Sequence, residues 1–232
     1  MKRFYANAAA REVVGGHEIL LDGRSVKTPA RAALCVPTRD LAEAIVEEWN
    51  SQGETIEPRA MPLTGLANAA IDRVGPERET FAAGLGRYAE NDLLCYRAEG
   101  PDALAARQAE HWAPLLEWAR RRFDVDFEIV EGIVHRPQPG GTIDRLRRAV
   151  EASGPFELAG LSPFVTISGS LVIALALAEQ AIDLDAAWEA ATVDEAWQLE
   201  QWGADAEAER VLAARRAEFA AAHRFLELLG QR

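Results

Sequence analysis

The chain has 232 residues, of which 37 are Asp or Glu and 25 are Lys or Arg, so its formal net charge at pH 7 is −12. Because 49% of its residues are hydrophobic, it can bury a core, which excludes a disordered or collagen-like chain. The acidic balance argues against nucleic acid and against anionic membranes as main partners, since both bind basic surfaces.

The first sixty residues are expected to be rich in β-strands, because short apolar runs alternate there with turn residues. Asp22-Gly23, between HEILL and RSVKT, is typical of a two-residue hairpin turn in which both central residues need positive φ. Thr38 is then expected to cap a helix that ends near Gln52. Trp49 lies on the apolar face of this helix and is predicted to be structural. The expected strands are 3–7, 12–14, 17–21, 24–27 and 33–36.

Beyond residue 60 the spacing of apolar residues predicts mostly helices. The segment 158–178 has 21 uncharged residues, about the length of a membrane span, but its first half contains Gly, Pro, Ser and Thr. We therefore expect a helix buried in a core rather than membrane insertion. The expected helices are 64–74, 76–91, 102–122, 142–152, 164–180, 183–202 and 205–229, with one isolated strand at 127–130.

These elements predict an α+β fold. A small β-rich N-terminal domain with one helix, residues 1–60, is expected to precede a larger, mainly α-helical C-terminal domain, residues 61–232. Charge is distributed unevenly over the second of these. Between Arg148 and Arg210 there are twelve acids and no Lys or Arg, whereas the rest of the chain is balanced. This stretch is either a solvated acidic face or an electrostatic docking surface for a basic partner.

The usual signatures of catalysis are absent from the sequence. There is no phosphate-binding loop and no dinucleotide-binding fingerprint, and the four histidines lack the spacing of metal ligands. Cys35 and Cys95 are far apart, which suits a reducing compartment. No metal, cofactor or small-molecule substrate is predicted. The alternative to a binding protein is a small soluble hydrolase that uses Glu195 or Asp92 as acid or base.

The segment 183–202, taken as one helix, places Glu195 in the middle of an apolar stripe that ends at Trp202. A carboxylate there needs an arginine of the same chain, a donor from a partner protein, or a catalytic role. Trp197 projects from the opposite side of this helix. The stripe comprises Leu184, Trp188, Ala191, Thr192, Leu199 and Trp202. The predicted partner-binding residues are Glu195, Trp202, Asp194, Gln198, Trp197 and Asp205.

Several short strings occur in a fixed order along the chain. They include Arg3-Phe4-Tyr5, Leu21-Asp22-Gly23-Arg24, Glu48-Trp49, Ile56-Glu57-Pro58, Asn68-Ala69-Ala70-Ile71-Asp72-Arg73, Asp92-Leu93-Leu94-Cys95-Tyr96-Arg97, Gln108 before Trp112, and Asp194-Glu195-Ala196-Trp197-Gln198 with Glu200, Trp202 and Gly203. Together these strings resemble a known family of assembly chaperones, which hold the alpha subunit of the F-type ATP synthase head.

The resemblance implies a non-enzymatic chaperone that shields the alpha-subunit surface later covered by beta. It also implies a β-containing N-terminal domain and a helical C-terminal domain, in agreement with the fold predicted from the residues. Eukaryotic relatives are mitochondrial and carry a presequence. The sequence Met-Lys-Arg-Phe-Tyr-Ala-Asn at the start shows no such segment, so a bacterial cytoplasmic location is expected.

Overall fold

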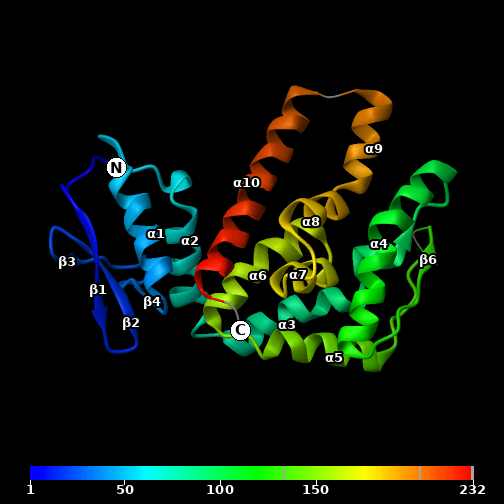
Figure 1. The fold of residues 1–232 in the computed structure, drawn as a ribbon, viewed down its shortest axis with the longest axis horizontal. Helices are drawn as coiled ribbons and strands as arrows, with labels where there is room; N and C mark the ends of the chain where they lie inside the picture. Colours follow the sequence, from blue (N-terminus) through cyan, green and yellow to red (C-terminus); the bar gives the residue numbers. More distant parts are fainter. Residues whose placement is uncertain (133, 204, 231–232) are drawn as a thin grey trace. The chain divides into compact units, whose positions relative to one another are not determined.

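The computed structural model of the protein describes residues 1–132, 134–203 and 205–230. It confirms the α+β class, with strands gathered near the N-terminus and helices in the rest of the chain (Figure 1). The chain forms two compact units. Unit 1 contains Met1–Arg78, Gly154–Gly160 and Ala221–Arg232, and unit 2 contains Glu79–Ser153 and Leu161–Ala220.

These units differ from the predicted division into residues 1–60 and 61–232. The reason is the hydrophobic core of unit 1, which includes Met61, Leu63 and Ala67 beyond the expected boundary. It also includes Phe225 from the C-terminal helix, whose ring stacks on Phe156 with 6.3 Å between the ring centres. Such long-range packing leaves no local mark in the sequence.

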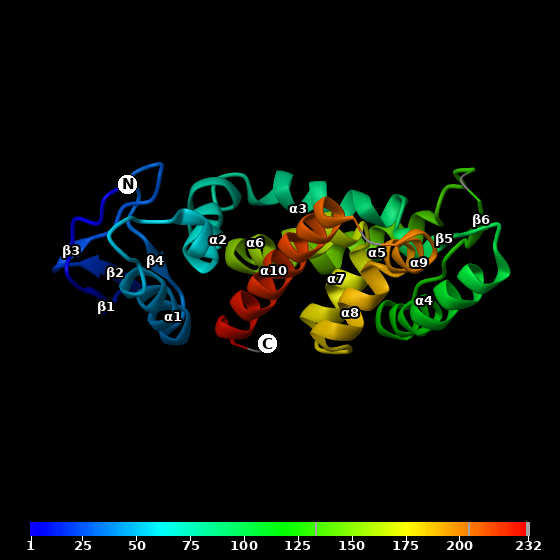
Figure 2. The ribbon, with the colours of Figure 1, turned by 90° about the horizontal axis from the view of Figure 1, so that it is seen from above.

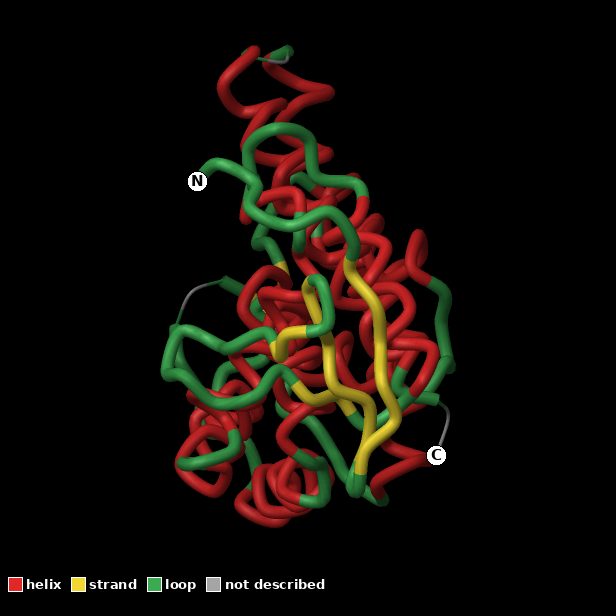
Figure 3. The backbone as a smooth tube through the Cα atoms, turned by 90° about the vertical axis from the view of Figure 1, so that its left-hand side faces the viewer, coloured by secondary structure: helices red, strands yellow, loops and turns green. Residues whose placement is uncertain are grey.

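Unit 1 contains a four-stranded antiparallel sheet in which the second strand pairs with the other three (yellow in Figure 3). The predicted turn at Asp22-Gly23 is confirmed, since φ is 47° at Asp22 and 78° at Gly23. Separate strands were expected at 3–7 and 12–14, but the structure has one strand, β1, at Ala8–Val13. The first residues of β1 pair with the end of β2, which sets where β1 begins. The strands are β1 Ala8–Val13, β2 Gly16–Leu21, β3 Arg24–Ser25 and β4 Cys35–Val36.

Helix α1, Arg39–Asn50, packs against this sheet, and the hydroxyl of Thr38 accepts a hydrogen bond from the Leu41 N–H at 3.3 Å, as expected for its cap. Trp49 is half-buried in the core of unit 1. Its ring lies edge-on to Tyr5 with 5.6 Å between centres, and the Tyr5 hydroxyl donates to the Trp49 carbonyl at 2.6 Å. Trp49 therefore ties α1 to the strand-bearing N-terminal segment.

Replacing Trp49 by arginine is expected to lower the free energy of unfolding by about 3 kcal/mol, because a guanidinium would replace a packed ring in this core. Trp49→Phe is the matched control. It keeps a ring beside Tyr5 and removes the indole Nε1, which is buried without a hydrogen-bond partner among the described residues. Chemical unfolding measures both variants, and an unchanged midpoint for Trp49→Arg would contradict the structural role.

The carboxylate of Glu48, also on α1, holds the start of the next helix, α2 (Pro62–Ala69). It accepts hydrogen bonds from the N–H groups of Leu63 and Thr64 at 2.7 and 2.8 Å, and from the Thr64 hydroxyl at 2.7 Å. The pKa of the Glu48 carboxyl is raised above its usual value, because the effect of burial exceeds the lowering effect of these hydrogen bonds. A short 3₁₀ turn, η1 (Pro58–Ala60), precedes α2 and a π-helical turn, η2 (Ala70–Val74), follows it.

Unit 2 is helical around α7, Leu171–Ala178, whose residues 171–177 are all buried. Helix α7 packs against α4 and α8, so the uncharged segment is part of a core, as expected. Among the described residues, no helix is long and apolar enough to cross a membrane. The other elements are α3 Arg78–Gly86, η3 Arg87–Glu90, η4 Leu93–Cys95, β5 Tyr96–Arg97, α4 Asp102–Phe123, β6 Val130–Glu131, α5 Gly140–Glu151, α6 Pro155–Ser168, α8 Leu184–Ala191, α9 Val193–Trp202 and α10 Ala206–Leu228.

Two of the long helices predicted from the sequence are each divided in two. The one expected over 164–180 breaks at Gly169, where φ is 68°, and Ser170 then caps α7 by accepting from the Ile173 N–H at 3.0 Å. The one expected over 183–202 breaks at Thr192, where φ is −124° and ψ is 22°. Helices α8 and α9 therefore have separate axes.

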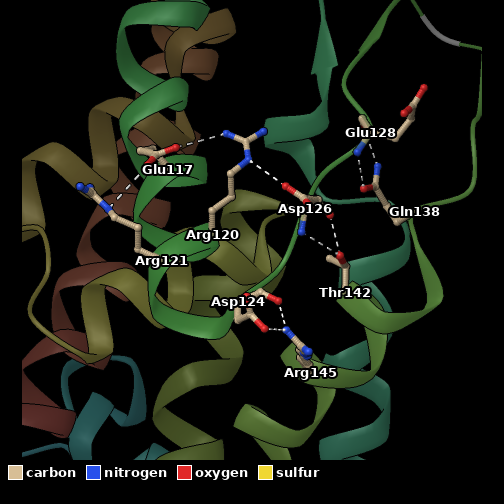
Figure 4. Close-up of polar contacts among 9 residues, drawn as sticks. All are labelled: Glu117, Arg120, Arg121, Asp124, Asp126, Glu128, Gln138, Thr142 and Arg145. Carbon is tan, nitrogen blue, oxygen red and sulfur yellow. Dashed lines mark hydrogen bonds and ion pairs between the residues drawn. The ribbon is translucent and has the colours of Figure 1, made fainter.

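The isolated strand expected at 127–130 is shifted and is not isolated, since β6 pairs in parallel with β5. The connector between α4 and α5 is tied down by polar contacts (Figure 4). Thr142 bridges to the backbone of Asp126, and Gln138 exchanges two hydrogen bonds with the backbone of Glu128 at 3.0 and 2.8 Å. Arg120 on α4 also lies 3.8 Å from the Asp126 carboxylate. These contacts hold the connector that carries β6.

Candidate functional site

Helix α9, which carries most of the predicted partner-binding residues, lies beside α4 (Figures 1 and 2). The guanidinium of Arg107 donates to both carboxylate oxygens of Glu200 at 2.7 and 2.8 Å, and it lies 5.2 Å from the centre of the Trp197 ring. This pairing lowers the pKa of the Glu200 carboxyl. The Gln108 amide donates to Asp194 at 2.7 Å. Trp197 and Asp194 thus dock α9 onto α4.

Glu195 lies elsewhere than the helical wheel predicted. Because the helix breaks at Thr192, the apolar stripe is not continuous, and Trp188 in its first half is buried whereas Trp202 at its end is 77% exposed. The Glu195 side chain is 42% exposed and lies 3.5 Å from Arg215 of α10. Of the alternatives left open by the sequence, the structure shows the pairing with an arginine of the same chain.

The α9–α10 hairpin, defined here as residues 193–203 and 205–220, exposes apolar side chains near its connection. Trp202 ends α9, and Val211 in the first part of α10 is 49% exposed. Gln198 is exposed as well. Asp205 is exposed and caps α10, since its carboxylate accepts from the Glu207 N–H at 2.8 Å.

Six of the twelve acids between residues 148 and 210 form ion pairs within the described part of the chain. Glu179 pairs with Arg122 at 2.6 Å, and Asp185 pairs with Arg216 at 2.6 Å. Others pair with Arg107, Arg215, Arg210 and Arg147, and Asp183 caps α8. The structure therefore favours a solvated face whose charge is locally offset over a bare acidic docking surface. Sequence reasoning missed these arginines, because they flank the stretch and return to it only in the fold.

Asp92, the other residue considered as an acid or base, is fully buried and serves the backbone. Its carboxylate accepts from the N–H groups of Leu94 at 3.1 Å and Val172 at 3.0 Å. The pKa of the Asp92 carboxyl is raised above its usual value, because the effect of burial exceeds the lowering effect of the hydrogen bonds from Ser170 and from backbone N–H groups. It caps the first turn of α7, with both oxygens occupied, so the geometry assigns it a structural role.

The described part of the chain contains no group of three or more His, Cys, Asp or Glu side chains arranged to hold a metal ion. The polar groups near α9 instead form pairs between helices. Such pairs can orient a surface for another protein, and none of them presents an activated nucleophile with an adjacent base. What the arrangement offers is a positioned hairpin with an exposed aromatic side chain.

Comparison with known proteins gives the family. The model for the ATP12 chaperone protein matches residues 2–120. The crystal structure of Atp12 from Paracoccus denitrificans has a TM-score of 0.94 and 41% sequence identity to this chain, and the match covers 98% of each. This chain belongs to the ATP12 chaperone family. The resemblance drawn from the ordered strings is thereby confirmed.

Two further proteins are similar to this chain over most of its length. A crystal structure of a protein from Agrobacterium tumefaciens matches with a TM-score of 0.94 and 40% identity, covering 98% of this chain and 86% of that one. The mitochondrial protein atp12 of Schizosaccharomyces pombe is 26% identical over 214 residues, which is 87% of this chain and 74% of that protein. The similarity therefore extends over both units and beyond the region that the family model matches.

Proposed function

We propose that this protein binds the unassembled alpha subunit of the F-type ATP synthase and covers its subunit interface until beta replaces it. Membership of the ATP12 chaperone family supports this proposal, as do the ordered strings. The observation that carries it is Trp202, whose large apolar side chain is 77% exposed at the end of α9. Exposed tryptophan is unfavourable in water and is a common anchor in protein interfaces.

The structure of the α9–α10 hairpin suits a chaperone that holds a client protein. Helix α9 is fastened to α4 through Arg107 and Gln108, so the backbone that carries Trp202 is positioned before any client arrives. Gly203 then ends α9 at a φ of 81°, and the exposed first turns of α10 follow. A subunit that waits for its partner exposes apolar surface, and a preformed apolar side chain can cover part of it without a folding step.

A holder must also release its client. Arg107 is paired with Glu200 and Arg215 with Glu195, so these charges are already offset within the protein. A client would thus meet an apolar anchor surrounded by largely compensated charges, which favours a modest and reversible interface over a permanent one.

The proposed function predicts capture and release. Purified alpha subunit alone is expected to stay soluble in the presence of this protein and to co-elute with it, and added beta is expected to displace it. Size-exclusion chromatography with light scattering measures both steps. Beta subunit alone is the matched control and should not be held. If alpha aggregates equally with and without this protein, or if beta does not displace it, the proposed function is wrong.

A further inference from the structure

Arg97 on β5 differs from the arginines around it, because its guanidinium forms no ion pair with any carboxylate that the structure describes. Of its three side-chain nitrogens, Nη1 is enclosed without a hydrogen-bond partner among the described residues. The guanidinium lies 4.8 Å from the centre of the Trp112 ring on α4. Arg107 and Arg120, on the same helix as Trp112, both pair with carboxylates. A half-buried cation without an anion is unusual in a chain of net charge −12.

The surroundings of Arg97 do not supply the missing anion. Glu131 is its register partner on β6, yet the two side chains form no ion pair. Burial lowers the pKa of the Arg97 guanidinium, and no carboxylate among the described residues raises it; the thiol of Cys95 is the neighbouring titratable group. Burial in turn raises the pKa of the Cys95 thiol to about 12, so this cysteine is neutral at pH 7. In the free protein the desolvation of Arg97 is therefore offset mainly by the Trp112 ring.

Resting on the proposed function, we propose that Arg97 binds a carboxylate side chain of the captured alpha subunit. The Trp112 indole is itself held, since its Nε1 donates to the Ala190 carbonyl at 2.8 Å. Trp112 thus holds the plane of the guanidinium. Nη1 is enclosed, so the edge formed by Nε and Nη2 is the one whose two N–H donors match the two oxygens of an Asp or Glu side chain. Binding would provide the anion that the free protein lacks.

Two further observations support a protein carboxylate as the ligand. A phosphate carries more charge and is usually held by several cations, but the nearby Arg120 is already shared by Glu117 at 3.7 Å and Asp126 at 3.8 Å. The strand β6 beside Arg97 is preceded by Ile129, which is 44% exposed. An arginine next to exposed apolar surface has the composition of a protein interface.

The segment that contains Arg97 is connected to the candidate site by hydrogen bonds. Gln108 accepts a hydrogen bond from the Ala98 N–H at 2.8 Å, next to Arg97 in the chain, and donates to Asp194 of α9 at 2.7 Å. One side chain thus joins β5 to the helix that carries Trp202. Arg97 and α9 both belong to unit 2, so a client bound to α9 lies on the same compact unit as Arg97.

The test compares Arg97→Met with Arg121→Met in the full-length protein. Methionine keeps an unbranched apolar stem over Trp112 and removes only the charged fork. Arg121 is the matched control, because it is exposed and lies near Glu117 at 3.7 Å. We expect Arg97→Met to weaken capture of purified alpha about tenfold, mainly through faster dissociation, and Arg121→Met to change it less than about twofold. Arg97→Lys, which keeps the charge without the fork, should fall in between.

Melting temperature distinguishes a binding role from a structural one. If Arg97 serves the client, Arg97→Met should melt at or above the temperature of the wild type, because an uncompensated charge has been removed. A clearly lower melting temperature, or unchanged capture of alpha by Arg97→Met, would overturn the assignment while leaving the proposed function intact. Failure of the wild type to capture alpha would overturn both.

Discussion

Replacing Asp92 by alanine is expected to lower the free energy of unfolding by about 4 kcal/mol. The carboxylate is fully buried and accepts from the N–H groups of Leu94 and Val172, and also from Ser170. Alanine would leave these donors buried without acceptors, and each unsatisfied donor costs roughly 1–3 kcal/mol. The first turn of α7, the central helix of unit 2, would keep its Ser170 cap but lose the acceptor for the Val172 N–H.

The matched control for this prediction is Asp183→Ala. Asp183 also caps a helix, since it accepts from the Ala186 N–H at 2.8 Å at the start of α8, but it is exposed. Water can replace its hydrogen bond, so the expected loss is about 1 kcal/mol. Asp92→Asn, which keeps one acceptor, should fall between the two. Denaturant unfolding followed by tryptophan fluorescence measures all three variants. Equal losses for Asp92→Ala and Asp183→Ala would show that Asp92 does not hold α7.

The sequence predicted the Asp22-Gly23 turn and the first helix of unit 1, because the signals for both are short in range. Asp22-Gly23 specifies its hairpin through the backbone freedom of two adjacent residues, and Thr38 caps α1 through its own hydroxyl. By contrast, the division of the chain into two units depends on Phe225 packing into a core formed mainly by residues 5–67. No spacing rule connects positions so far apart.

The two broken helices differ in how far they could have been foreseen. Gly169 tolerates positive φ and Ser170 is a common helix cap, so these two residues indicate a helix break. The long apolar run around them favours one continuous helix instead, and that signal led to the wrong prediction. Thr192 carries no comparable signal. Its buried hydroxyl donates to the Trp188 carbonyl at 2.8 Å, and a Thr that bonds back to the carbonyl four residues earlier can bend a helix. A helical wheel drawn through Thr192 therefore placed Glu195 wrongly relative to Trp188.

The candidate site was predictable in composition but not in pairing. The block around Trp197 and Trp202 was identified from its residues, and the structure shows that one tryptophan faces Arg107 while the other is exposed. The partner of Glu200 lies 93 residues earlier in the chain. Arg97 belongs to one of the ordered strings, yet only the structure can show that none of the described carboxylates pairs with it.

Trp202→Ala is expected to weaken capture of the alpha subunit about 30-fold, because tryptophans at interface centres commonly contribute about 2 kcal/mol or more. Its side chain is 77% exposed in the free protein, so the free energy of unfolding should change by less than about 0.5 kcal/mol. The loss should appear mainly in the dissociation rate of the complex, measured by surface-bound alpha subunit and flowing chaperone.

Phe4→Ala is the matched control, since Phe4 is an exposed aromatic residue (65%) in unit 1 and outside the α9–α10 hairpin. A general loss of exposed apolar area would weaken both variants alike, whereas a specific anchor affects only Trp202→Ala. Val211→Ala, on the other arm of the hairpin, should give a smaller loss, because valine contributes less buried area than tryptophan. Capture by Trp202→Ala at wild-type strength would exclude the hairpin as the client-binding surface, and the exposed tryptophan would then need another explanation.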